Sequence, residues 1–404
     1  MGIDTHGEMH YAEIQDERQN ILWHGRIGNT REGFESLLQK IRKIEESNSN
    51  RIEGIFMNPT GNFHVPVKYF LESNGFPGMV HMVDARRTVH LRKVMNLGTE
   101  KSDREDAHVL AATPWLDRKS MEGHGHERNP LSEITRERDA ILKNITRIKN
   151  RILGDLAAVF PEFTSVLAVD SAAGLAVLEE YSTSGIIAGT DTGSILKLMR
   201  KAGRNHYSME NSEMLVAAAR NTIGIPDPHG VYAFRIRTNA RRLMNEISEI
   251  RMVEREIESR SSDNRDVNNL TEMRGIGCVN ATGIVSEVGD IRQFASATKL
   301  QSYGGKCPDM TGSGGKSYPV GITRTRNRYL SNAAYESAVS LVTHRNKEFY
   351  DLFTREIGKK KSKTEAYVVV AKRLLFHVYS IMKNGKPYRE RKPGRGGRGS
   401  LPVE

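Results

Sequence analysis

Residues 1–30 read MGIDTHGEMHYAEIQDERQNILWHGRIGNT. Three short runs in this stretch, MGIDTH, MHYAEIQD and NILWHGRIGNT, are rich in β-forming residues and are separated by polar or glycine-containing turns. They predict three consecutive strands in an antiparallel meander. Asp4 stands in the middle of the first predicted strand, although aspartate is depleted from strand interiors. An acid at that position therefore needs a chemical explanation.

Alternating helices and strands follow the meander. A helix after Thr30, which is placed to cap it, has an apolar face of residues at helical spacing: Phe34, Leu37, Leu38, Ile41 and Ile44. The next segments predict a strand, a helix, a strand and a helix in turn: residues 51–61, 62–75, 78–84 and 85–95. This order of elements is that of an RNase H-like α/β fold, which we expect for residues 1–115.

Composition and charge narrow the class of protein. The chain has 404 residues, enough for two or three domains, and 38% of them are hydrophobic. Its net charge of +11 favours a polyanionic partner, because clustered lysine and arginine side chains neutralise phosphates. Cys278 and Cys307 are too few for a disulfide framework or a four-thiolate zinc site, which fits a reducing cytosol. We find no membrane-spanning stretch and no export signal, so we expect a cytoplasmic protein without a membrane partner.

Two long helices are predicted within residues 116–267. Each has a narrow apolar stripe: Ile134, Ile141, Ile145, Ile148 and Ile152 in the first, and Leu243, Ile247, Ile250, Val253 and Ile257 in the second. Such seams predict a coiled coil, within one chain or between two chains. Packing of each helix on a neighbouring domain is the alternative. Residues 161–232 form a less charged insert to which the sequence assigns no role.

Residues 268–383 are expected to form a mostly α-helical domain that begins with a helix-hairpin-helix. In NLTEMRGIGCVNATGIVSEVGD, residues 269–290, Gly275 and Gly277 allow a tight turn whose amide groups point at a phosphate. A chance occurrence of Gly-Ile-Gly is the alternative. The tail, residues 384–404, is basic and rich in glycine, and we expect it to be disordered, as a solvated terminus or as an arm that contacts RNA.

The stretch KSDREDAH, residues 101–108, places three carboxylates in four positions. In a helix that begins at Lys101 or Ser102, Asp103 and Asp106 share one face and Glu105 points elsewhere. Local charge pairing is one explanation of this cluster. The other is shared binding of Mg²⁺ together with Asp4, because in RNase H-like folds an acid of the first strand meets acids from a later strand and a later helix.

Five motifs occur in this order: GIDTH, MNPTGNF, KSDREDAH, MRGIGCVNATGIVSEVGD and GGKCPDMTGSGG. Over residues 1–115 and 268–340 they resemble the DEDD transposases of the insertion-sequence one-ten family and the related pilin-gene invertases. The resemblance implies a RuvC-like domain with four acids, a dimerising coiled coil and a C-terminal transposase domain with a serine nucleophile. It also implies a nucleoid-associated homo-oligomer, a dimer or tetramer, in which a bridge RNA pairs with target and donor DNA.

By this resemblance Asp4 matches the first acid, Asp103 and Asp106 match the third and fourth, and Ser313 matches the nucleophile. At the second acid the family has Glu-Pro-Thr-Gly, whereas this chain has Asn58 before Pro-Thr-Gly. An asparagine oxygen still ligates Mg²⁺ but carries no charge, so we expect a lower metal affinity. A natural variant with a relaxed site, an inactive copy and a deliberate substitution are the three explanations, and we favour the first.

Judged by sequence chemistry alone, a serine in GSGG is part of a flexible linker. As a nucleophile, Ser313 needs positive charge around the phosphate that it attacks, and four basic residues follow it: Lys316, Arg324, Arg326 and Arg328. Nonspecific contact with a nucleic-acid backbone is the other role for these cations. We expect an RNA-guided, Mg²⁺-dependent DNA recombinase. A junction nuclease of the RuvC type that uses the acids alone, and a catalytically weakened nucleic-acid-binding copy, are the alternatives.

Overall fold

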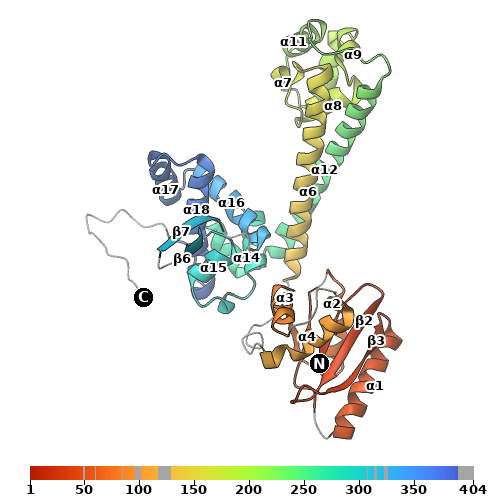
Figure 1. Ribbon diagram of the computed structural model, residues 1–404. Helices are drawn as coiled ribbons and strands as arrows, with labels where there is room; N and C mark the ends of the chain where they lie inside the picture. Colours follow the sequence, from red (N-terminus) through yellow and green to blue (C-terminus); the bar gives the residue numbers. More distant parts are fainter. Residues whose placement is uncertain are drawn as a thin grey trace, which may run out of the picture. The chain divides into compact units, whose positions relative to one another are not determined.

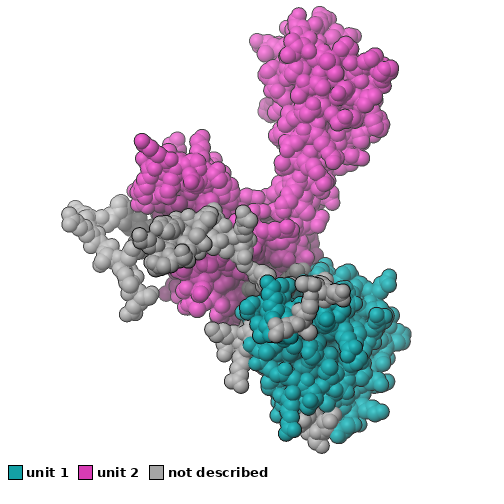
Figure 2. Space-filling model, in the orientation of Figure 1, with its two compact units in different colours: residues 1–127 teal, residues 128–404 magenta. Residues whose placement is uncertain are grey.

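The computed structural model describes residues 1–48, 51–59, 61–83, 85–95, 102–116, 129–306, 308–313, 316–322 and 326–389. Of residues 308–313 and 316–322 it describes the backbone only. The chain divides into two compact units, Met1–Glu127 and Arg128–Glu404, which Figure 2 colours separately. Within the described ranges, no helix has both the length and the apolar character that crossing a membrane requires.

The N-terminal unit is built on a mixed five-stranded sheet. Its strands are β1 (Gly2–Asp4), β2 (Met9–Gln15), β3 (Ile21–Gly28), β4 (Ile55–Met57) and β5 (Val80–Met82). They lie in the order β3-β2-β1-β4-β5, with the first three strands antiparallel and with β1, β4 and β5 parallel. Figure 1 labels β2 and β3 of this sheet. The predicted meander is confirmed, and the sheet order is consistent with an RNase H-like fold.

Helices cover both faces of this sheet: α1 (Arg31–Asn48), α2 (His64–Ser73), α3 (Ala85–Val94) and α4 (Asp103–Leu116). Ile3 of β1 is buried in a core to which α1 and α2 contribute. On the opposite face α4 packs against β1, β2 and β4, and its Leu110 meets Phe56. Since successive strand residues point to opposite faces, Gly2 and Asp4 lie on the side of α4.

The close approach of α4 to the sheet depends on Gly2. A Cβ atom at this position would lie 2.2 Å from the carbonyl oxygen of Ala107 and 2.3 Å from the amide nitrogen of Ala111. Both are backbone atoms of α4, which yield only if the whole helix moves. The missing side chain at Gly2 therefore lets the first turn of α4, which begins with Asp103, lie beside the end of β1.

In the C-terminal unit, two long helices form an antiparallel hairpin, α6 (Pro130–Val159) and α12 (Val231–Ser261), as Figure 1 shows. Polar pairs fix their register: Arg138 contacts Glu254, and Asn144 contacts Glu246. The predicted apolar stripes contribute the buried residues Ile141, Ile148, Ile152, Leu243, Ile250 and Ile257. The two helices thus pair within the chain, one of the two coiled-coil arrangements expected.

Residues 161–232, to which the sequence assigned no role, fold as a helical head on this hairpin. The head contains α7 (Phe163–Val166), α8 (Ala172–Glu180), α9 (Ser184–Ala188), α10 (Thr192–Ala202) and α11 (Met209–Arg220). Its core is continuous with that of the hairpin, because Phe163 and Leu178 of the head share one cluster with Ile152 and Leu243. The head and the end of the hairpin therefore fold as one body.

The rest of the C-terminal unit is a mostly helical body with one β-hairpin. Its elements are α13 (Arg265–Thr271), α14 (Cys278–Val288), the 3-10 helix η1 (Ile291–Gln293), α15 (Ala297–Tyr303), β6 (Pro308–Ser313), β7 (Lys316–Ile322), α16 (Arg328–Thr343), α17 (Lys347–Gly358) and α18 (Lys363–Asn384). Arg136 of α6 binds this body, because its Nε and Nη2 atoms donate to the two carboxylate oxygens of the buried Glu287 at 2.6 and 2.8 Å. This two-point pair fixes the base of the helical hairpin on α14.

Candidate metal centre and nucleic-acid interface

Asp4 and Asp103 converge on one histidine. Asp4 lies at the carboxyl end of β1, beside the end of the parallel strand β4, and not in the middle of its strand as expected. The Nε2 atom of His6 lies 3.0 Å from Oδ2 of Asp4 and 3.1 Å from Oδ1 of Asp103. One ligand atom from each of these side chains lies within 4.8 Å of the other two. The three residues therefore form a group of the size that binds one cation.

Asp106 is close enough to affect the charge of Asp4. Burial raises the pKa of Asp4, the hydrogen bond and the charge of His6 lower it, and the carboxylates of Asp106 and Asp103 raise it again. The net change is upward, so this site disfavours the charged form of Asp4. A cation bound among the three acids would reverse that penalty.

Arg92 of α3 contacts the same acidic stretch. Its Nη1 atom donates to Oδ1 of Asp106 at 2.6 Å, and its Nη2 atom donates to Oε2 of Glu105 at 2.9 Å. Asp106 and Arg92 are both largely shielded from water, whereas the side chain of Asp103 is 60% exposed. Local charge pairing, the alternative to metal binding, therefore accounts for the contact of Glu105 with Arg92 and for one contact of Asp106. Asp103 does not share this arginine and instead contacts His6, which also contacts Asp4.

Asn58, which stands where the family has its second acid, follows β4 directly and is buried. The Oγ1 atom of Thr88 donates to its side-chain oxygen Oδ1 at 3.0 Å, and the Oγ1 atom of Thr5 donates to its backbone oxygen at 3.3 Å. Thr88 and Arg92 are four residues apart on α3, so they lie on one face of that helix. A single helix therefore contacts both Asn58 and Asp106.

Two residues of this site, His6 and Arg92, were not predicted from the sequence. His6 had a signal, because it lies two residues after Asp4 and side chains with that spacing point to the same side of an extended chain. Arg92 had none, since its position depends on how α3 packs against α4.

The donor set fits a hard divalent cation. Mg²⁺ prefers carboxylate oxygens, and Asp4 and Asp103 supply two of them on either side of the imidazole N–H of His6. Nε2 of His6 contacts both carboxylates, so it lies where a positive charge would be stabilised by both of them. Asp4, Asp103 and Asp106 are the residues that would hold the ion, with Asn58 beside them.

The residues of the predicted helix-hairpin-helix lie on α13, α14 and the turn between them, and the two helices contact each other. Gly275 in the turn has a φ of +103°, and a Cβ atom there would lie 3.0 Å from Cα of Leu341. Gly277 has an ordinary φ of −85° at the N-cap of α14, and a Cβ atom there would meet nothing within 4 Å. The backbone conformation of the turn therefore favours glycine at Gly275 and not at Gly277, while the contact of their amide groups with a phosphate stays a prediction.

The serine and the predicted cations lie on and around the β-hairpin. Ser313 ends β6 and pairs with Lys316, the first residue of β7; the side chains of both lie outside the described residues. Arg324 and residues 390–404 of the tail also lie outside the described residues. Arg326 is exposed, and the exposed Arg328 donates from Nη2 to the hydroxyl of Tyr329 at 2.8 Å.

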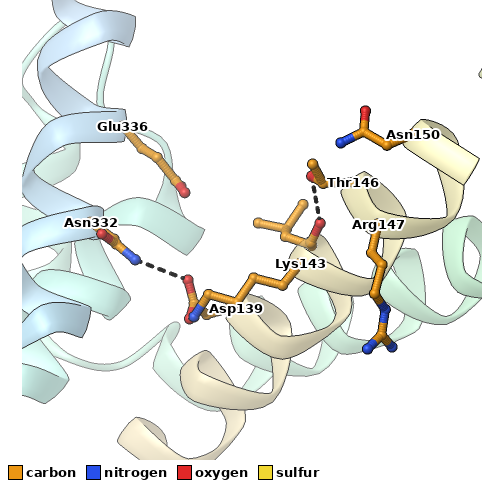
Figure 3. Close-up of a pocket in the computed structure, with 8 residues that line it drawn as sticks. Asp139, Lys143, Thr146, Arg147, Asn150, Asn332 and Glu336 are labelled. Atoms are coloured by element: carbon orange, nitrogen blue, oxygen red, sulfur yellow. Dashed lines mark hydrogen bonds and ion pairs between the residues drawn. The ribbon is translucent and has the colours of Figure 1, made fainter. Parts of the chain in front are cut away.

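A cleft of about 510 Å³ lies between α6 and α16 (Figure 3). Its charges are mixed, and Figure 3 shows Asn332 of α16 bonded to Asp139 of α6, the acid that also pairs with Lys143. Because this lysine is neutralised within the cleft, we do not assign a phosphate site there. The remaining lining residues are Leu142, Thr146, Arg147, Asn150 and Glu336.

Comparison with known families defines the class of protein. Residues 1–161 match the transposase family model DEDD_Tnp_IS110, and residues 267–354 match the model described as transposase IS116/IS110/IS902 family. The first range carries the Asp4 and Asp103 cluster, and the second carries the helix-hairpin-helix and Ser313. Together they define a transposase, an enzyme whose substrate is DNA. The chain belongs to the IS110 family of transposases.

Individual relatives agree with this assignment over about three quarters of the chain. The IS110 insertion-element 43.6 kDa protein of Streptomyces coelicolor is 24% identical over 312 residues, which cover 75% of this chain and 76% of the relative. The IS900 insertion-element 42 kDa protein of Mycobacterium paratuberculosis is 26% identical over 308 residues, with 75% and 76% covered. The transposase for insertion sequence element IS1111A of Coxiella burnetii is 21% identical over 294 residues, with 72% and 69% covered.

Proposed function

We propose that this transposase cleaves and rejoins DNA strands as a Mg²⁺-dependent recombinase whose nucleophile is Ser313. The observation that carries the proposal is the convergence of Asp4 and Asp103 on the same atom of His6, at 3.0 and 3.1 Å. Two carboxylates from distant parts of the sequence meet there at the end of the central strand.

Asp4, Asp103 and Asp106 are proposed to hold the metal ion, with the amide oxygen of Asn58 as a neutral member of the set. An ion held there would supply positive charge to the scissile phosphate and to the leaving oxygen. Nε2 of His6 lies within hydrogen-bond distance of both Asp4 and Asp103. Nη1 of Arg92 pairs with Oδ1 of the buried Asp106 carboxylate at 2.6 Å.

Ser313 is proposed to attack the DNA phosphate. Its hydroxyl loses a proton, its oxygen bonds to phosphorus, and the bond from phosphorus to one deoxyribose oxygen breaks and leaves a hydroxyl end. The reverse attack by a hydroxyl end of another strand releases the serine and rejoins the DNA. Lys316 and Arg324 are close to Ser313 in sequence and are proposed to stabilise the charge that develops on the phosphate.

RNA guidance and oligomeric assembly are proposed on the family resemblance. The net charge of +11 suits a chain that binds a bridge-type RNA as well as two DNA duplexes. Exchange of strands between donor and target needs several cleavages, which favours a dimer or tetramer of this chain. We place the complex at the nucleoid in the cytoplasm.

The test is a strand-cleavage assay on the ends of the element and its target, with the co-purified RNA retained. We expect Ser313→Ala to abolish the covalent protein–DNA adduct, and Asp4→Asn and Asp106→Asn to abolish cleavage while DNA binding stays nearly unchanged. Cleavage that survives in Ser313→Ala would establish the junction nuclease instead. A loss of DNA binding as large as the loss of cleavage in Asp106→Asn would make the acids structural.

A weakened, binding-only copy is the second candidate function. It is favoured by Asn58, because this residue brings no charge and its side-chain oxygen already accepts the hydroxyl of Thr88. The native chain would then bind DNA but fail to cleave it at any Mg²⁺ concentration. Cleavage by Asn58→Glu, but not by the native chain, would identify that case.

A further inference from the structure

Lys306 is a buried lysine whose described neighbours leave its charge uncompensated. Only 6% of the residue is exposed. Its Nζ atom donates to Oγ of Ser331 at 3.1 Å and lies 5.8 Å from the ring centroid of Tyr335. None of the described carboxylates forms an ion pair with it. A buried ammonium group with only a hydroxyl and a ring beside it is costly unless an anion joins it.

A second cation lies next to Lys306. The side chain of Arg326 crosses the backbone of Gly305, where a Cβ atom would lie 2.2 Å from Cδ of Arg326. Gly305 has a φ of +64°, so this turn favours glycine in both space and conformation. Burial lowers the pKa of Lys306 to about 8, and the charge of Arg326 lowers it in the same direction. Two neighbouring cations that repel each other favour an anion between them.

These two cations flank the root of the β-hairpin. Lys306 stands before β6 and Arg326 stands after β7. The amide of Asn327 donates to the carbonyl of Tyr303 at 2.8 Å and so closes the root. Since Ser313 is at the other end of β6, a nucleic acid held at the root lies on the same hairpin as the proposed nucleophile.

We propose that Lys306 and Arg326 form a binding site for a DNA backbone phosphate at the root of the β-hairpin. This inference rests on the proposed function, because DNA is chosen over RNA on the ground that the hairpin carries Ser313. Lys306 supplies a fixed ammonium group, positioned by Ser331 and Tyr335, and Arg326 supplies a guanidinium that is open to solvent. In the cleft between α6 and α16, by contrast, the positive charge of Lys143 is paired with the carboxylate of Asp139.

The site is tested by binding of the full chain to a fluorescein-labelled DNA duplex of arbitrary sequence, measured by anisotropy over a series of salt concentrations. Lys306→Gln and Arg326→Gln are compared with Lys299→Gln, which removes the same charge from an exposed position of α15. We expect each site variant to bind roughly tenfold more weakly, with the slope of log affinity against log salt reduced by about 0.9. Lys299→Gln is expected to bind like the native chain.

Thermal unfolding of the same variants separates this role from a structural one. Lys306→Gln removes a buried charge, so its unfolding temperature is expected to be equal to or above that of the native chain. Unchanged DNA binding together with a lower unfolding temperature would overturn the site and leave Lys306 as a packing residue. Loss of binding to single-stranded RNA with duplex binding intact would also overturn it. Failure of the native chain to bind DNA at all would instead contradict the proposed function.

Discussion

The guanidinium of Arg92 donates to Oδ1 of Asp106 at 2.6 Å, and the two side chains are only 12% and 4% exposed. This pair joins α3 to α4 beside the Asp4 and Asp103 cluster. It places the positive charge of a guanidinium next to a carboxylate that lies close to two others. The acidic site of this transposase therefore includes a positive charge from the protein itself, the guanidinium of Arg92.

Removal of that cation is expected to destabilise the N-terminal unit. Arg92→Ala removes the guanidinium from the buried carboxylate of Asp106, a change that costs about 3 kcal/mol. Calorimetric unfolding of the full chain measures it. Arg104→Ala, an exposed arginine of α4, is the matched control, for which we expect a loss below about 0.5 kcal/mol. If adding Asp106→Asn to Arg92→Ala restored no stability, the pair would not be the cause.

Enlarging Gly2 is expected to displace α4. In Gly2→Ala the new methyl group meets backbone atoms of Ala107 and Ala111 at 2.2 and 2.3 Å, so the helix must shift at a cost of about 1–3 kcal/mol. The shift moves Asp103 away from Asp4, and Mn²⁺ binding followed by electron paramagnetic resonance should weaken. Gly28→Ala is the control in β3, because its Cβ atom would meet only the Thr30 hydroxyl, at 3.7 Å. Equal metal affinity in both variants would contradict the role given to Gly2.

Asn58→Glu, which restores the second acid, is expected to make the free energy of unfolding depend more strongly on bound Mg²⁺. Without metal, Asn58→Glu should be less stable than the neutral, equally large Asn58→Gln by roughly 1–3 kcal/mol, because a buried charge is added beside Asp4. With Mg²⁺ this deficit should shrink by about 1.4 kcal/mol, since a roughly tenfold tighter site adds that much stability at saturation. Unfolding temperatures with and without Mg²⁺ measure both effects. The same Mg²⁺ response in the two variants would exclude position 58 from the metal site.

Glu348 in the C-terminal body is expected to make stability depend on pH. Burial raises its pKa, but bonds from His377, Arg373 and Tyr388 outweigh burial and lower the pKa from 4.5 to about 2. A lowered folded-state pKa stabilises the protein above pH 4.5, and this contribution disappears as pH falls from 4.5 toward 2.

Glu348→Gln should therefore lose about 2–3 kcal/mol at pH 7 and roughly half as much at pH 3. Denaturant unfolding at a series of pH values provides the measurement. Glu258→Gln, at an exposed position of α12, serves as the control and should follow the native pH profile. A loss in Glu348→Gln that is the same at pH 7 and pH 3 would assign the effect to packing and not to charge.

Local patterns in the sequence were sufficient for the elements of the N-terminal unit. Alternating β-forming runs and the apolar spacing from Phe34 to Ile41 specify strands and helices through short-range geometry, and those residues are buried as expected. The same reasoning identified Asp4, Asp103 and Asp106 as candidates. It misjudged the place of Asp4, which stands at the strand end, because the pairing of β1 with β4 stops at Ile3 and residue propensity does not show where pairing stops.

Tertiary structure alone decided how these groups meet. The contacts of Arg92 with Asp106 and of Thr88 with Asn58 join α3 to residues outside that helix, and no local spacing encodes them. The fold of residues 161–232 likewise depends on a core shared with α6 and α12. Local sequence fixes elements because backbone preferences act over a few residues, whereas a site is set by packing, which sums many weak contacts between distant segments.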